Sequence, residues 1–213
     1  MTALVTAGVL TQPAGSAGVD GRLARSARTR TAVIDALLAL YEEGDLSPTA
    51  VRVAARAGVA LRTVYGHFAD MESLYAEASE REFGRMAEVG TVVPADLPYD
   101  ERVRRFAENR AVVLEWMLPV MRAAAMREHG SRQLQRSRDR FVAVGDAEVR
   151  LLLADELVGL DARQRADLLQ AVHVVAGGPA WIALRIDRGL PPEAAGQLLH
   201  RLVSAMLADL LEP

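Results

Sequence analysis

The fold of this 213-residue chain is decided by the segment Ala54-Ala55-Arg56-Ala57-Gly58-Val59-Ala60-Leu61-Arg62-Thr63-Val64-Tyr65-Gly66-His67-Phe68. Its spacing predicts a helix, a sharp turn at Gly58 and a second, short helix. Val51, Ala54 and Ala55 share one face of the first helix, and the small side chain of Ala54 lets another helix cross closely. Glycine adopts the positive φ of such a turn without steric cost. The pattern is typical of a helix-turn-helix.

The second helix of this segment carries polar and aromatic side chains on its outer face. Val59 and Val64 are predicted to face a small core, which leaves Leu61, Arg62, Thr63, Tyr65 and His67 outside. Arginine, threonine, tyrosine and histidine side chains reach base edges and phosphates. On spacing alone, an ordinary helical hairpin with an alanine-rich contact is the alternative to a DNA-binding surface.

The start of the first helix allows two interpretations of Ser47-Pro48-Thr49. Either Ser47 is the N-cap and Pro48 the first helical residue, or Thr49 is the N-cap and Pro48 lies just outside.

Charge is distributed unevenly along the chain. Arg22, Arg25, Arg28 and Arg30 form an acid-free arm, and residues 22–69 hold seven arginines against four acidic residues. Residues 71–213 hold 18 arginines against 22 acidic residues. A basic end on an acidic remainder suits a protein that presents one end to DNA.

Residues 29–68 resemble the DNA-binding domain of the tetracycline-repressor (TetR) family of bacterial transcription regulators. The chain departs from the family at Ala60, where serine is most frequent, and at Met71, where lysine is. The resemblance is carried by Arg30–Ala36, Gly44, Thr49–Ala54, Ala57-Gly58-Val59, Thr63–Phe68 and Asp70–Tyr75.

This resemblance implies a homodimer that binds double-stranded DNA. The expected DNA contacts are Arg25, Arg28, Arg30, Thr49, Leu61, Arg62, Thr63, Tyr65 and His67. Leu61, Arg62, Thr63 and Tyr65 are expected in the major groove. Thr49, His67 and the arm arginines are expected on phosphates, with the arm as a candidate for the minor groove.

The whole chain is predicted to be all-α, because no alternating strand pattern competes with the helical periodicity. We expect a disordered tail at 1–21, a DNA-binding head at 22–70 and a helical body at 71–213. The body helices are predicted at 70–89, 99–117, 120–128, 132–158, 162–188 and 193–211, with Pro119 kinking or restarting the chain. No apolar stretch is long enough to span a membrane and no signal peptide begins the chain, so a cytoplasmic location is expected.

The last two predicted helices are apolar on more than one face, which favours either a deeply buried pair or a second partner. TetR regulators dimerise through their last two helices, so the resemblance favours a second partner over a deeply buried pair. The expected interface residues are Leu169, Val172, Leu184, Leu199, Leu202 and Met206.

A small-molecule pocket in the body is likewise implied by the resemblance, although plain core packing is the alternative for each residue. Methionine and aromatic side chains suit apolar ligands, and Arg105 and Arg110 are candidate polar anchors. The expected lining is Trp116, Met117, Met121, Phe141, His173 and Trp181. For His173, a core or interface histidine is the alternative.

No cofactor, metal site or enzymatic activity is expected. The chain has no cysteine, which excludes thiolate ligands and cysteine catalysis. Its four histidines lack metal-ligand spacing, and neither a phosphate-binding glycine loop nor a nucleophile elbow is present. A ligand-responsive repressor is therefore the favoured function. The alternative is a helical ligand-binding or protein-interaction module whose head no longer contacts DNA.

Overall fold

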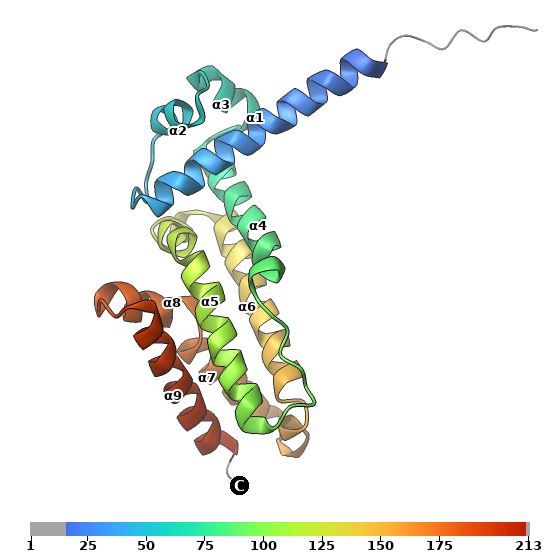
Figure 1. The fold of residues 1–213 in the computed structure, drawn as a ribbon, viewed down its shortest axis with the longest axis vertical. Coiled ribbons are helices and arrows are strands. Elements are labelled where there is room, and N and C mark those ends of the chain that lie inside the picture. Colours follow the sequence, from blue (N-terminus) through green and yellow to red (C-terminus); the bar gives the residue numbers. More distant parts are fainter. Residues whose placement is uncertain (1–15, 212–213) are drawn as a thin grey trace, which may run out of the picture.

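The computed structural model describes residues 16–211, all of them in helices or connecting loops, so the predicted all-α class is confirmed. A head made of α1, α2 and α3 sits on one end of an elongated body, and α4 runs from one into the other (Figure 1). The α-helices are α1 Ser16–Glu42, α2 Ala50–Ala57, α3 Leu61–His67, α4 Met71–Val89, α5 Tyr99–Ala125, α6 Arg132–Leu152, α7 Ala162–Val175, α8 Gly178–Ile182 and α9 Pro192–Leu211. Short 3₁₀ turns occur at Glu128–Gly130 (η1) and Glu156–Gly159 (η2), and a π-helical segment, η3, at Ala183–Asp187.

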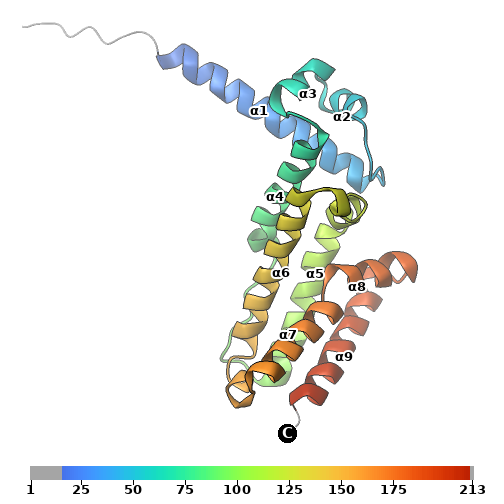
Figure 2. The same ribbon diagram turned by 180° about the vertical axis from the view of Figure 1, so that it is seen from behind.

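The first helix is longer than the sequence analysis expected. It begins at Ser16, so residues 16–21, assigned to a disordered tail, are helical; residues 1–15 of that tail lie outside the described residues. Helix formation is cooperative once a nucleus exists, and the folded part of α1 supplies one. The arginine arm is therefore the N-terminal half of a continuous helix that projects beyond the head (Figure 2).

Helix α5 continues through Pro119, so the chain does not restart at this residue, and the helices predicted at 99–117 and 120–128 are one helix that ends at Ala125. Proline removes one backbone hydrogen bond from a helix. Packing of α5 against α1, α4, α8 and α9 holds the rest of the helix together. As a result α5 spans almost the whole body, from the distal end to the base of the head (Figure 1).

The helix predicted at 162–188 is broken at Gly177. A Cβ at this position would lie 2.2 Å from the carbonyl oxygen of His173, a distance that no side chain tolerates. The chain turns there and restarts as α8, with Pro179 in its first turn, a position that proline favours. The predicted helix at 132–158 also ends early, at Leu152, and its last residues form η2.

One segment, Ala162–Asp187, is long and apolar enough by composition to cross a membrane, which the sequence analysis did not find. In the structure it is interrupted at Gly177, and α7 packs against α6 and α9. A membrane-spanning helix needs a continuous run of about 20 residues, so this segment is instead part of the body.

Two hydrophobic clusters hold the protein together. The head cluster is centred on Val33, Leu37, Val53, Val64 and Leu74 and extends onto Met117, Val120 and Ala123 of α5. The body cluster is formed by α5 to α9 and includes Phe106, Leu114, Leu168, Trp181 and Leu199. Because α5 contributes to both clusters, the head is packed directly onto the end of a body helix.

Candidate nucleic-acid interface and body cavity

The turn between α2 and α3 has the geometry that its sequence predicts. Gly58 has a φ of 66° in the left-handed region, and its N–H donates to the carbonyl of Ala55 at 3.2 Å. The open choice at the start of α2 is decided in favour of Thr49, whose Oγ1 accepts from the backbone N–H of Arg52 at 3.3 Å. Thr49 remains exposed while capping the helix.

The buried face of α2 differs from the expected one. Ala50, Val53 and Ala54 are buried, whereas Val51 is 61% exposed and Ala55 is also exposed. Val53 and Ala54 follow Ala50 by three and four residues, so the three side chains share the face of α2 that packs in the head, where α2 meets α1.

Helix α3 presents most of the predicted contact residues to solvent. Val64 is buried and fixes the helix to the head core. Leu61 and Tyr65 are 40% and 52% exposed, Arg62 is exposed, and Thr63 and His67 are half-buried. Ala60 occupies the N-cap position without a side-chain hydrogen bond. The residues of this helix expected to contact DNA are together called the α3 face: Leu61, Arg62, Thr63, Tyr65 and His67.

Arg30 is positioned differently from the other arm arginines. Its Nε donates to Glu77 Oε1 at 2.6 Å, its Nη1 donates to the carbonyl of His67, and its guanidinium lies 4.4 Å from the ring centroid of Phe68. It therefore ties α1 to the end of α3 and to α4. Arg22, Arg25 and Arg28 are all exposed. The interaction with Glu77 has no signal in the sequence, because the two residues are 47 positions apart.

Replacing Gly58 with valine should destabilise the head. Its positive φ costs a non-glycine residue about 1–2 kcal/mol, and a β-branched one more. We expect a lower melting temperature and weaker DNA binding, measured by calorimetry and by titration with DNA. Gly66→Ala is the matched control for the melting temperature, since an added Cβ there meets nothing within 4 Å and the residue is helical. Equal melting temperatures for Gly58→Val and the wild type would mean that the turn between α2 and α3 does not require glycine at this position.

Arg127, just after α5, connects the body to the head. Its Nη1 donates to the carbonyl of Leu46, in the loop between α1 and α2, at 2.7 Å. Its guanidinium also lies 4.3 Å from the ring centroid of Tyr75. The hydroxyl of Tyr75 in turn donates to the carbonyl of Pro48 at 3.1 Å. The loop that precedes α2 is thereby attached to the end of a body helix.

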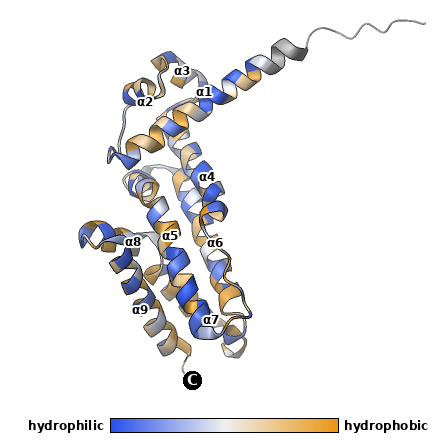
Figure 3. Ribbon diagram, viewed as in Figure 1, coloured by the Kyte–Doolittle hydropathy of each residue, from blue (hydrophilic) through white to orange (hydrophobic). Residues whose placement is uncertain are grey.

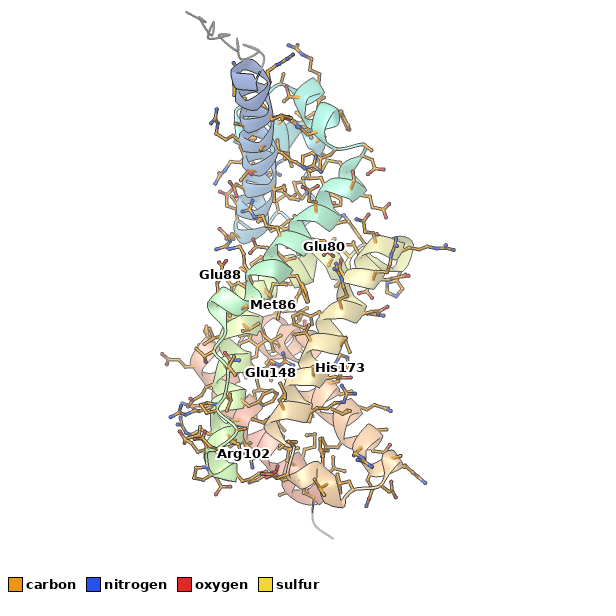
Figure 4. All side chains as sticks on the ribbon, turned by 90° about the vertical axis from the view of Figure 1, so that its right-hand side faces the viewer. Glu80, Met86, Glu88, Arg102, Glu148 and His173 are labelled. Atoms are coloured by element: carbon orange, nitrogen blue, oxygen red, sulfur yellow. The ribbon has the colours of Figure 1, made fainter. Side chains whose placement is uncertain are left out.

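The body contains a cavity of about 170 Å³ between α4, α5, α6, α7 and α8. Four of the expected residues line it: Met117, Met121, Phe141 and His173. His173 is labelled in Figure 4, which views the molecule from the side of α6. The lining that the sequence analysis missed includes Ser79, Phe83, Ala124, Leu134 and Ile182. These residues come from separate helices, and sequence spacing alone does not show which helices meet.

The two tryptophans lie elsewhere. Trp181 is fully buried in the body cluster, and its Nε1 donates to Glu115 Oε2 at 3.0 Å. Trp116 packs against the head cluster, and the guanidinium of Arg85 lies 5.5 Å from the centroid of the Trp116 ring. Neither lines the 170 Å³ cavity. Trp116 and Met117 are adjacent in a helix, and their side chains consequently point in different directions.

The expected interface residues separate into two groups. Val172 and Leu199 are buried inside the body cluster, so neither side chain is available to a partner. Leu202 is 44% exposed, and Leu169, Leu184 and Met206 are half-buried. Val174 of α7 and Ile186 of η3 are additional exposed apolar residues. Hydrophobic residues continue along α9 towards its C-terminal end (Figure 3).

The comparisons with known proteins agree with this geometry. Residues 33–78 match the family model described as bacterial regulatory proteins, tetR family, which covers α2, α3 and part of α1 and α4. The comparison with curated proteins found no match.

Solved structures with the same fold cover most of this chain. A tetR-family transcriptional regulator from Streptomyces coelicolor is 21% identical with a TM-score of 0.65, and the alignment covers 86% of this chain and 82% of that one. A transcriptional regulator from Rhodococcus is 20% identical with a TM-score of 0.62, covering 86% of this chain and 96% of that one. The shared fold thus includes the body as well as the head.

Proposed function

We propose that this chain, a TetR-family regulator with a helix-turn-helix head, is a ligand-responsive transcriptional repressor that binds a palindromic operator as a homodimer in the cytoplasm. The observation that carries the proposal is the exposed α3 face, held on a glycine turn beside a basic helical arm. The proposed role is regulatory, with no catalytic step.

The α3 face is assigned to the major groove, whose edges distinguish all four base pairs. Leu61, Arg62, Thr63 and Tyr65 would contact bases there, while Thr49 and His67 would contact phosphates. Arg30 is reassigned from a DNA contact to a positioning residue, because Glu77 and the His67 carbonyl already occupy its guanidinium.

The arm is assigned to the phosphate backbone rather than to the minor groove. Arg22, Arg25 and Arg28 lie on a helix. An α-helix with side chains is about 10–12 Å wide, and the minor groove is only about 6 Å wide. A helix of this width lies along the groove's edge, where arginines at three-residue spacing can pair with successive phosphates.

Dimerisation is supported by energetics and by the exposed apolar residues of α7, η3 and α9. One recognition helix contacts only a few base pairs, and each good contact supplies about 1–3 kcal/mol. A two-fold dimer doubles these contacts and places two α3 faces about one DNA turn apart. Leu169, Leu184, Leu202 and Met206 are retained as interface residues, with Val174 and Ile186 added.

Ligand response is assigned to the 170 Å³ cavity and the adjoining end of α5. Ala124, Ala125 and Glu128 line the cavity, and Arg127 lies between them in the sequence. Residues 124–128 would take different positions in two conformations of the protein. A ligand that binds one of these conformations better would shift this segment and, through Arg127, the loop at Leu46 and α2. Only such a difference in affinity between two conformations can move the equilibrium away from the DNA-bound state.

Replacing Arg127 with methionine should uncouple the head from the body. The variant loses a charged hydrogen bond to Leu46, which is worth about 1.5–3 kcal/mol, and the stacking on Tyr75. We expect faster amide hydrogen exchange in residues 33–64 and unchanged exchange in α7 and α9. Arg105→Met is the matched control, since Arg105 lies on α5, the helix that Arg127 follows, and pairs with Glu101 of that helix at 2.7 Å. Equal effects of the two variants on the head would contradict the coupling role.

The function is tested by selecting genomic fragments with the purified protein at near-physiological salt and sequencing them. An enriched palindrome supports a dimeric repressor, and its affinity should fall with salt at a log–log slope of about −0.9 per phosphate contact. A folded dimer that enriches no sequence contradicts it and favours the alternative, an interaction module. The observation that favours this alternative is that Ala60, the N-cap residue of α3, makes no side-chain hydrogen bond to the helix.

A further inference from the structure

The cavity in the body has a polar neighbour that the proposed function does not use. A second, smaller cavity of about 10 Å³ lies next to the 170 Å³ cavity, and Phe141, Val142 and His173 line both. Arg110 and Gly145 line only the smaller one. A cavity of this size holds one water molecule or one ligand oxygen.

Arg110 is a buried guanidinium with too few partners. Its residue is 7% exposed, and its Nε is buried without any hydrogen-bond partner. Its ion pair joins Nη1 to Glu148 Oε2 at 3.4 Å, longer than the ~2.7–2.9 Å of a strong charged hydrogen bond. Guanidinium groups carry five N–H donors, and buried donors normally find acceptors. Burial lowers the pKa of Arg110, while Glu148 and Asp146 act in the opposite direction.

The helix opposite is shaped around this side chain. Gly145 lies inside α6, although glycine is the poorest helix former after proline. A Cβ at Gly145 would lie 2.6 Å from Nη2 of Arg110, so glycine leaves room for the guanidinium in the position that it occupies. The side chain is therefore held against α6 beside the smaller cavity. Glu148 and His173 are at the same level of the body in Figure 4.

The formal charges around Arg110 already balance. Glu148 faces Arg110, and it also accepts from Asn109 Nδ2 at 3.3 Å. Asp146 pairs with Arg150 on its own helix at 3.9 Å. An additional carboxylate would introduce an uncompensated buried charge, which is costly. A neutral oxygen would satisfy the free donor without that cost.

Most polar side chains of the larger cavity are already paired within the protein. Its hydroxyl groups are used within the protein, since Ser79 donates to the carbonyl of Tyr75 at 3.0 Å and Ser137 donates to Glu80. Arg138, also in the lining, pairs with Glu128. Apart from His173, the remaining lining is mostly methionine, aromatic and aliphatic side chains, which favour an apolar ligand. Its volume is close to the roughly 150 Å³ that holds a benzene molecule in an engineered cavity.

We propose that the effector is a small neutral molecule with an apolar body and one carbonyl oxygen, whose body fills the 170 Å³ cavity and whose oxygen accepts a hydrogen bond from Arg110. The oxygen occupies the smaller cavity, reached past Phe141 and His173. This inference rests on the proposed ligand response and specifies the ligand's chemistry.

The test compares three probes of nearly equal size on the full-length protein by calorimetry: acetophenone, ethylbenzene and benzoate. Acetophenone should bind at least about tenfold tighter than ethylbenzene, the usual gain from a charged hydrogen bond, and tighter than benzoate. Arg110→Met should reduce the acetophenone preference to about twofold or less. Arg104→Met, the matched control on the same helix, should keep it, because Arg104 lines neither cavity and pairs with Glu101 of its own helix at 2.6 Å.

The proposal is overturned if the wild type binds acetophenone and ethylbenzene equally, binds benzoate most tightly, or binds none of the three. Infrared spectra of bound acetophenone make the test independent of whether Arg110→Met folds. The carbonyl band should shift to lower wavenumber than in an apolar solvent, and an unshifted band overturns the assignment of Arg110. Genomic-fragment selection on the same sample separates the two proposals, since intact operator binding without a carbonyl preference rejects only this ligand class.

Discussion

Replacing Tyr65 with alanine should lower the affinity for the operator by about 30-fold or more while leaving the dimer intact. Tyr65 is 52% exposed in the middle of α3, the helix assigned to the major groove. A base contact is worth about 1–3 kcal/mol, and a symmetric dimer loses it in both half-sites. The combined loss of about 2 kcal/mol or more corresponds to that factor. Titration of a labelled operator and analytical ultracentrifugation measure the two quantities.

Tyr65→Phe separates the ring from the hydroxyl. If the ring packs against a thymine methyl group, the phenylalanine variant keeps most of the affinity; if the hydroxyl contacts DNA, both variants lose it. Val51→Ala on α2 is a control at an equally exposed position of the head. Wild-type affinity in Tyr65→Ala would remove this residue from the DNA-binding surface.

Replacing Gly177 with alanine should destabilise the body by about 3 kcal/mol, the upper part of the range for overpacked sites. The new Cβ would lie 2.2 Å from the carbonyl oxygen of His173. This obstacle is backbone, so no side-chain rotation relieves the clash. Either α7 and α8 must separate, or the segment must straighten into one helix, and both movements displace Trp181 from Glu115. Urea unfolding followed by tryptophan fluorescence measures the loss.

Gly84→Ala is the matched control for this change. Gly84 is an exposed residue inside α4, and a Cβ there meets nothing within 4 Å. Alanine should stabilise the helix by up to about 1 kcal/mol. The two glycine-to-alanine changes are therefore expected to have opposite signs. A stabilised Gly177→Ala protein would mean that the break between α7 and α8 is not sterically required.

The sequence was most informative where structure is local. The left-handed turn at Gly58 and the N-cap of α2, narrowed by the sequence to Ser47 or Thr49, depend on residues within a few positions of one another, which makes them predictable. Helical periodicity also identified most of the helices in the body. The overall all-α class follows from the same local signals.

Errors arose where distant residues decide the outcome. The sequence predicted two helices on either side of Pro119, but packing against neighbouring helices keeps α5 continuous. Two expected interface residues, Val172 and Leu199, are buried in the protomer, because an apolar helix does not reveal which of its faces meets its own chain. Trp116 and Trp181 were grouped with the cavity by residue type, whereas their neighbours place both outside it.

The sequence by itself determined the helix-turn-helix, the basic arm and the helical class, because turns, caps and periodicity are set by neighbouring residues. Only the tertiary structure decided that Arg30 pairs with Glu77, that Arg127 holds the loop at Leu46, and that Arg110 lies buried against Gly145. These contacts join residues 35 to 81 positions apart. They form because folding brings separate helices together and buried charged groups then need partners.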